Sequence, residues 1–300
     1  MSLKFVKELS DNIYFIKGQR SGKYPYSHSL LIGKSLIDTG ISSRYIRKLK
    51  RKYAIKNVLL THWHEDHISG NRLLPKARFF AHEYDVPIIE DVNKMYSSYY
   101  VGDKTQQKEL FEMILGGLRL ENTEVDHLIS NKQTMETEGG FEIKVIHTPG
   151  HSAGHCCFLE LSTGTAFLGD IDLSDFGPWY AARDSSLRDF EKSIQKIEKM
   201  DINLAATGHR EIISGRSNIQ EDLKRYREIL TEREDRILSL LPEKKPTSLA
   251  DLIGKNIIYH HYSKYEIYEK MAEKVMIQQH LEKLVSEDKI KKENGKFFRK

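Results

Sequence analysis

Cysteine, proline and long hydrophobic runs are the scarce features of this 300-residue chain, which holds 2 cysteines and 7 prolines. The cysteines, Cys156 and Cys157, are neighbours in an apolar stretch, and adjacent cysteines rarely cross-link. We therefore expect buried thiols in a reducing compartment rather than a disulfide framework. No run reaches the roughly 20 apolar residues of a membrane-spanning helix, and the first residues lack an apolar signal core. The sequence thus predicts a cytoplasmic protein with no membrane partner.

Charged residues are numerous but nearly balanced, with 47 Lys and Arg against 43 Asp and Glu and a formal net charge of +4. So small an excess does not by itself indicate a nucleic-acid partner or an anionic membrane surface. The length exceeds what one compact domain usually needs, so we expect a second, small domain.

Residues 61–70 read Thr-His-Trp-His-Glu-Asp-His-Ile-Ser-Gly and carry the strongest signal in the chain. They place His62, His64, Asp66 and His67 directly after the apolar run 57–60, which is typical of a buried strand. Side chains two residues apart on an extended segment point the same way, and those past the turn approach from another direction. Ligand-type groups delivered from two directions favour two adjacent metal ions over one.

Three later segments repeat the same pattern of an apolar strand, a glycine and then a histidine or aspartate. His151 follows a Pro-Gly turn, Asp170 follows Gly169, and His209 ends the segment from Leu204. The glycine lets the backbone turn tightly, while the strand holds the polar side chain in a fixed place. Loops on a rigid sheet are where chemistry concentrates, so we expect these side chains at one site.

This ordered set of residues resembles the metallo-β-lactamase superfamily, and all seven positions of its dinuclear pattern are present. The turn Asp38-Thr39-Gly40 is also similar to an early turn of that superfamily. The resemblance implies an α/β fold, an αββα sandwich with the metals at the edge of its two sheets. It covers most of the chain and extends to the lactamase-beta-like protein 2 branch, which implies cleavage of single-stranded RNA.

Five imidazoles and two carboxylates without a thiolate suit Zn²⁺ best, with Fe²⁺ or Mn²⁺ as alternatives. His62, His64 and His151 can hold one ion, Asp66, His67 and His209 a second, and Asp170 can bridge them. Two adjacent cations lower the pKa of a shared water toward neutrality, which provides hydroxide to attack a carbonyl or phosphoryl centre. Asp66 lies on the open side and is the expected carrier of the proton to the leaving group.

Several other polar or aromatic residues are candidates for the surroundings of the metals. Tyr180 is a candidate catalytic residue, an oxyanion donor, and Trp179 a candidate hydrophobic wall, although ordinary loop packing is the alternative for both. Asp172 is a candidate outer carboxylate that orients a ligating histidine. His28 is either a polar residue at a strand mouth or a substrate contact, and His82 is at most an indirect contributor.

The segment from about 84 to 132 is longer than a sandwich of this kind requires. Apolar residues with helical spacing lie between 109 and 118, and Tyr96, Tyr99 and Tyr100 add an aromatic cluster. Because a structureless segment of this length is improbable in a compact domain, we expect a helical insertion. It serves as a packing element, including a homodimer interface, or as a lid over the metals.

The remaining pattern predicts two domains, a catalytic one at 1–217 and a C-terminal one at 218–300. The C-terminal part begins with a long amphipathic helix at 218–241 that Pro242 ends, followed by a short linker. The later elements are a short helix at 248–253, a helix at about 265–286 and a basic hairpin at 289–298 with an Asn-Gly turn. Helices followed by a basic hairpin are similar to a winged-helix module. The C-terminal domain is therefore expected either to contact RNA phosphates or only to shape the rim of the active site.

Four functions remain open at this stage. The leading hypothesis is a dinuclear metallo-hydrolase that acts on a small-molecule ester, thioester, lactone or amide. The second is a metal-dependent endoribonuclease that uses the C-terminal domain as a clamp for single-stranded RNA. The third is an iron-dependent dioxygenase, and the fourth is a nucleic-acid-binding module with a structural metal site.

Overall fold

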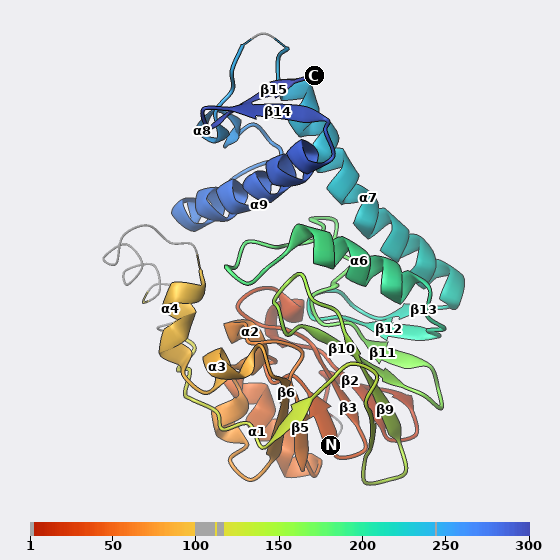
Figure 1. Cartoon of the computed structure of the whole chain (residues 1–300). Helices are drawn as coiled ribbons and strands as arrows, with labels where there is room; N and C mark the ends of the chain where they lie inside the picture. The colour runs from red at the N-terminus through yellow and green to blue at the C-terminus, as the bar shows by residue number, and fades with distance from the viewer. Residues whose placement is uncertain (1–2, 100–111, 113–116, 244) are drawn as a thin grey trace.

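Two β-sheets stack face to face, and helices cover the outer face of each sheet (Figure 1). The computed structural model describes residues 3–99, 112, 117–243 and 245–300. This helix–sheet–sheet–helix order is the expected α/β sandwich.

The first sheet has seven strands in the order of the sequence. Neighbouring strands are antiparallel up to β4, and from β4 to β7 they are parallel. The strands are β1 (Val6–Ser10), β2 (Ile13–Ile16), β3 (Ser29–Ile32), β4 (Ser35–Ile37), β5 (Asn57–Leu59), β6 (Arg78–His82) and β7 (His127–Ile129). The carboxyl ends of the parallel strands meet at one edge, where ligand-binding loops gather.

The second sheet has six strands in the order β13-β12-β11-β10-β9-β8. All its neighbouring pairs are antiparallel except β11 with β12. The strands are β8 (Thr134–Glu136), β9 (Glu142–His147), β10 (Cys156–Glu160), β11 (Thr165–Phe167), β12 (Leu204–Ala206) and β13 (Ile213–Ser214).

Strand β10 shows how one strand serves two cores. Cys156 and Phe158 point into the layer between the sheets, whereas Cys157 and Leu159 pack under the helices on the outer face. This alternation is the period of two that β-structure imposes on side chains. Both cysteines are buried and free, which confirms the prediction of core thiols.

Helices cover the outer faces because each has an apolar stripe. Helix α1 (Ser43–Lys52) is capped by Ser42 and buries Ile46 and Leu49 against the first sheet. Ser186 caps α6, whose apolar face packs against the second sheet together with α7. The other helices of this part are α2 (Glu65–Ile68), α3 (Val86–Ile89), α4 (Met95–Ser98), α6 (Leu187–Glu198) and α7 (Arg216–Leu240), with short 3-10 turns η1 (Gln19–Gly22), η2 (Asn71–Leu73) and η3 (Val92–Lys94).

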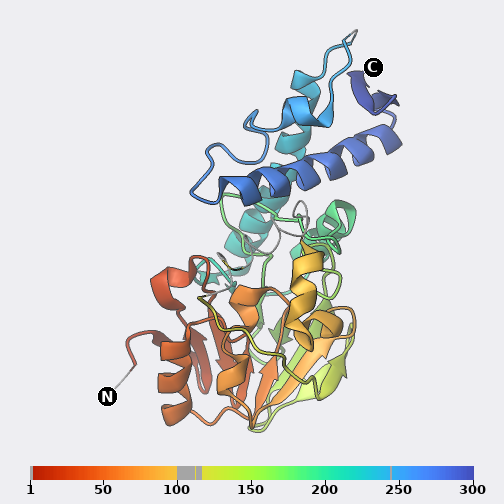
Figure 2. The same cartoon turned by 90° about the vertical axis from the view of Figure 1, so that its left-hand side faces the viewer.

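The C-terminal elements lie at one end of the molecule, and α7 connects them to the sheets (Figure 1 and Figure 2). They are α8 (Leu249–Leu252), α9 (Glu266–Ser286) and the hairpin of β14 (Ile290–Glu293) and β15 (Lys296–Arg299). These bounds match the expected two helices and hairpin; a winged-helix assignment stays a prediction. The apolar cluster on the second sheet continues into α7 and α9, so both expected domains share it, and the boundary near residue 217 stays a prediction.

The expected helical insertion is partly wrong. Strand β7 lies inside the range 84–132 and pairs with β6, so the insertion ends earlier than predicted. Three residues at a sheet edge, with Leu128 exposed, leave no clear periodic signal in a sequence. Residues 86–98 do form short helices, whereas most of the stretch 109–118 falls outside the described residues. Among the described helices, none is long and apolar enough to cross a membrane.

Candidate metal centre

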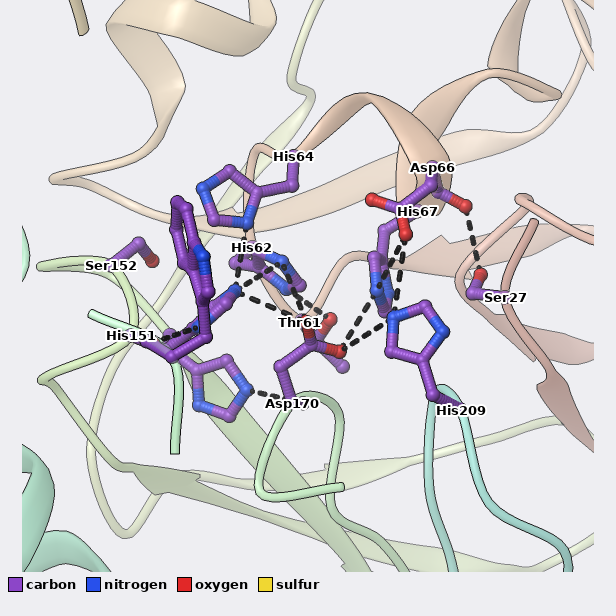
Figure 3. Close-up of polar contacts among 12 residues, drawn as sticks. Ser27, Thr61, His62, His64, Asp66, His67, His151, Ser152, Asp170 and His209 are labelled. Atoms are coloured by element: carbon purple, nitrogen blue, oxygen red, sulfur yellow. Dashed lines mark hydrogen bonds and ion pairs between the residues drawn. The ribbon is translucent and has the colours of Figure 1, made fainter. Parts of the chain in front are cut away.

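The seven predicted ligands meet at one edge of the two sheets, and they come from the loops that follow four strands (Figure 3). Strands β5, β9, β11 and β12 each lead into one of these loops. The side chains form two groups whose potential ligand atoms lie within 4.8 Å of one another, namely His62, His64, His151 and Asp170, and Asp66, His67 and His209. The structure therefore brings together all seven predicted metal ligands.

The backbone around Asp66 is held by a close contact that only glycine permits. A Cβ atom on Gly40 would lie 1.4 Å from the carbonyl oxygen of Asp66. The Ser27 hydroxyl donates to the same carbonyl at 2.9 Å. Helix α2 thus sits directly on the turn that follows β4, which fixes where Asp66 and His67 project.

The first group presents three ring nitrogens at short range. His151 Nε2 lies 2.7 Å from His64 Nδ1 and 3.2 Å from His62 Nε2. Burial lowers the pKa of both His62 and His64 well below the usual value, so these rings are neutral. Ligand nitrogens around one tetrahedral zinc lie about 3.3 Å apart, given bond lengths of about 2.0 Å. The spacing fits a cation.

The second group is more acidic. His209 Nε2 lies 3.3 Å from Asp66 Oδ2, and His67 Nε2 lies 3.9 Å from the same oxygen. Burial alone would lower the pKa of His67, but Asp170, Asp66 and Asp38 outweigh it and raise this pKa well above its usual value. In the metal-free protein this group therefore binds protons where a cation would otherwise bind.

Asp170 lies between the two groups. Its Oδ2 is 3.1 Å from His151 Nε2, and its Oδ1 is 2.9 Å from His67 Nε2 and 3.5 Å from His209 Nε2. Burial favours the neutral acid, yet the surrounding histidines hold the pKa of this carboxyl well below its usual range. One carboxylate thus reaches both groups, which is the position of a bridging ligand.

Two buried atoms at this site show that the residues fit a metal. His67 Nε2 and Asp170 Oδ1 are 2.9 Å apart, but neither has a hydrogen-bond partner with suitable geometry. Buried polar atoms in native proteins are rarely left without a partner, and a bound cation satisfies such atoms by coordination. Bound divalent ions would satisfy these atoms, and the seven side chains are the residues that would hold them.

One carboxylate outside the ligand set orients a histidine in each group. His67 Nδ1 donates to Asp38 Oδ2 at 2.7 Å, and the Thr61 hydroxyl donates to the same oxygen at 2.7 Å. Because that hydroxyl is the donor, His62 Nδ1 donates to Thr61 Oγ1 at 2.9 Å. Both rings are therefore held with Nε2 free for a metal.

Two other ligand histidines, His151 and His209, are oriented by backbone carbonyls. His151 Nδ1 donates to the carbonyl of Trp179 at 2.8 Å, and His209 Nδ1 donates to that of Gly22 at 2.7 Å. Gly22 has φ of +69°, and a Cβ there would lie 2.6 Å from the ring of His28. His28, which is fully buried, thus supports the turn that orients His209.

Two predictions for the surroundings of the metals are wrong. The Tyr180 side chain is fully buried, and its hydroxyl lies 2.6 Å from His280 Nε2 and accepts from Arg233 at 3.1 Å. It points toward α7 and α9, so Tyr180 is not the oxyanion donor. Asp172 accepts from the backbone of Ser174, and among the described residues it bonds to no ligand histidine. Asp38 has the role expected of Asp172.

His82 stacks on His147 with ring centroids 4.0 Å apart, away from the ligand set. Sequence reasoning missed His155, whose Nε2 accepts from the backbone N–H of Asp170 at 3.0 Å. It also missed Glu65, whose carboxylate accepts from Tyr24 at 2.8 Å and Tyr99 at 2.7 Å. The only feature of the sequence that pointed to Glu65 was its position next to Asp66.

Comparisons with known proteins agree with this geometry. A family model described as the metallo-beta-lactamase superfamily matches residues 26–209, which hold all seven ligands. Over 269 residues the chain is 26% identical to a Beta-lactamase-like protein 2 homolog of Drosophila melanogaster, which covers 85% of this chain and 80% of that protein. Over 192 residues it is 27% identical to an atrochrysone carboxyl ACP thioesterase of Aspergillus fumigatus, which covers 64% of this chain and 49% of that protein.

The fold agrees as well with a crystal structure of a metallo-beta-lactamase family protein from Thermus thermophilus. The TM-score is 0.72 at 20% identity, and the alignment covers 98% of this chain and 100% of the other. The shared fold therefore includes the C-terminal elements.

Proposed function

This chain belongs to the metallo-β-lactamase superfamily and is a hydrolytic enzyme, and from this premise we propose that it hydrolyses a thioester or a related ester, lactone or amide with two metal ions. The observation that carries the two-metal proposal is the position of Asp170. Its two oxygens lie within 3.5 Å of histidines from both groups. The identity of the ions, zinc before iron or manganese, is part of the proposal.

Bound divalent ions would supply Lewis acidity and lower the pKa of water. The residues of this chain determine where that chemistry occurs. In the second group the side chains of His209 and Asp66 are 20% and 8% exposed, whereas in the first group those of His62 and His151 are 0% and 3% exposed. Substrate therefore approaches from the side of the second group.

For a thioester, a water oxygen forms a bond to the carbonyl carbon, the carbon–sulfur bond breaks, and the proton of water passes to the leaving thiolate. Asp66 is the carboxylate best placed on the exposed side to transfer this proton, as the sequence indicated. The thioesterase name of one relative supports a thioester among the candidate substrates.

An endoribonuclease remains the second candidate. The C-terminal hairpin exposes Lys291, Lys292 and Lys296, which fit a surface for phosphates. The resemblance to beta-lactamase-like protein 2 homologues over most of the chain supports this candidate as well.

A substrate panel tests these candidates. Protein loaded separately with zinc, manganese or ferrous iron is assayed on an acyl thioester, a lactone and a short single-stranded RNA. We expect metal-dependent thioester cleavage that falls by about 10³-fold in Asp170→Ala, because several kcal/mol of charge stabilisation are lost. The matched control Asp172→Asn retains activity. If the protein cleaves RNA and leaves the thioester uncleaved, the endoribonuclease replaces the acyl hydrolase as the proposed function.

A further inference from the structure

Three aromatic rings from three distant segments meet beside the metal ligand His64. Tyr99 follows α4, Trp179 lies in the loop after Gly177-Pro178, and Tyr268 lies in the first turn of α9. The ring centroids of Tyr99 and Trp179 lie 5.7 and 5.5 Å from that of His64. Tyr268 contacts both, at 6.0 Å from Tyr99 and 6.5 Å from Trp179. We call these three residues the aromatic corner.

The aromatic corner has a shape that suits a flat group. The planes of Trp179 and Tyr268 differ by only 20° and their ring centroids lie 6.5 Å apart, so the two rings present nearly parallel faces. Tyr99 meets them at 68° and 79° and forms a side wall. Trp179 and Tyr268 are half-buried and pack against the apolar cluster of the first sheet, so neither residue is completely enclosed.

The aromatic corner is also rigid. Two donors of the buried Arg233 hold the loop that carries Trp179, each at 2.6 Å from a carbonyl oxygen, one of Pro178 and the other of Phe176. The Tyr99 hydroxyl donates to Glu65. A platform fixed in advance loses little entropy when a ligand binds, which raises its affinity.

The described part of the chain places no cationic side chain over the rings of the aromatic corner. Glu65 and Asp66 are buried next to the aromatic corner. A phosphate group would find no lysine or arginine over these rings among the described residues, whereas an uncharged planar group would meet ring faces. Offset stacking of aromatic rings adds to the free energy of burial, and a puckered aliphatic ring cannot make this contact.

We propose that Trp179 and Tyr268 bind a flat, uncharged aromatic acyl group of the substrate, whose carbonyl carbon then reaches the metal centre. This inference rests on the proposed acyl hydrolysis and names the substrate class of that site. It also makes α9 a part of the active site rather than only a packing element.

Matched acyl groups of equal ring size test this inference in the metal-loaded protein. Benzoyl and cyclohexanecarbonyl thioesters of one thiol are compared by kcat/KM, and benzoate and cyclohexanecarboxylate by their inhibition constants. We expect the planar member of each pair to be favoured by about tenfold, as stacking on two rings implies. Equal values, or a preference for the puckered ring, would overturn the inference.

Variants of Tyr268 show whether this ring causes the preference for planar acyl groups. Tyr268→Leu should reduce the planar preference to about twofold or less, whereas Tyr268→Phe keeps the ring and should retain it. Ile267→Ala, at an exposed neighbour on the same helix, is the matched control and should also retain it. A planar preference that survives in Tyr268→Leu would remove Tyr268 from the site. Because Tyr268→Leu can disturb α9, the thermal unfolding of this variant is recorded. The comparison of planar and puckered acyl groups in the wild-type protein does not depend on this variant.

Calorimetric binding of benzoate and cyclohexanecarboxylate separates this inference from the proposed function. If no thioester or ester is hydrolysed, the proposed function fails, yet tighter binding of benzoate still supports the aromatic corner. If thioesters are hydrolysed but both carboxylates bind equally, the aromatic corner fails alone.

Discussion

Asp38 provides the sharpest test of how the metal centre is organised, because one buried carboxylate supports a histidine in each group. In Asp38→Asn the amide retains the size of the side chain but loses its charge and one acceptor. The bond from His67 at 2.7 Å loses its charged acceptor directly, and the bond from His62 loses this support through Thr61. Removal of such an outer partner typically weakens metal binding 10- to 100-fold, or by about 1.4–2.7 kcal/mol per ion.

Thr61→Val separates the two branches. Valine has nearly the shape of threonine but no hydroxyl, so only the branch to His62 is broken, and the bond from His67 to Asp38 remains. We expect Thr61→Val to weaken one ion by about tenfold and Asp38→Asn to weaken both. Competition with a chromophoric chelator measures the two dissociation constants. Wild-type affinities in Asp38→Asn would refute the reasoning, and so would equal losses at both ions in Thr61→Val.

Three further changes test other parts of the structure. Gly40→Ala places a Cβ against the Asp66 carbonyl and should reduce binding of the second ion, seen by elemental analysis, while Gly117→Ala, with open space around it, should not. Arg233→Met removes donors from two carbonyls and should cost about 3 kcal/mol in urea unfolding; an unchanged midpoint would contradict this. Burial alone would raise the pKa of Glu234, but His280 Nδ1 at 3.4 Å and Lys283 Nζ at 2.8 Å from its Oε1 outweigh burial and hold this pKa at about 2, below the ordinary 4.5. The stability from this group is therefore present above pH 4.5 and lost as the pH falls toward 2, so Glu234→Gln should be less stable by about 3 kcal/mol at pH 7 and equal to wild type near pH 2.

The ligands could be predicted from the sequence because each follows a strand in a local pattern. An apolar run, a tight turn and a polar residue specify the position of a side chain without knowledge of the rest of the fold. The same holds for the Asn294-Gly295 hairpin, since its contacts lie within a few residues.

The residues around the ligands depend on contacts that join distant segments. Tyr180 is close in sequence to Asp170, yet the ring of Trp179 turns toward His64 while Tyr180 turns toward Arg233. No local pattern decides which of two adjacent aromatic residues faces the site. Tyr268 was missed for the same reason, because only the packing of α9 brings it to the metal centre.

The central claim is that two ions share Asp170. Anomalous diffraction from crystals grown with zinc or manganese tests it most directly. The account predicts two anomalous peaks per chain, one among His62, His64 and His151 and one among Asp66, His67 and His209, with Asp170 between them. A single peak, or an empty site at saturating metal, would contradict it.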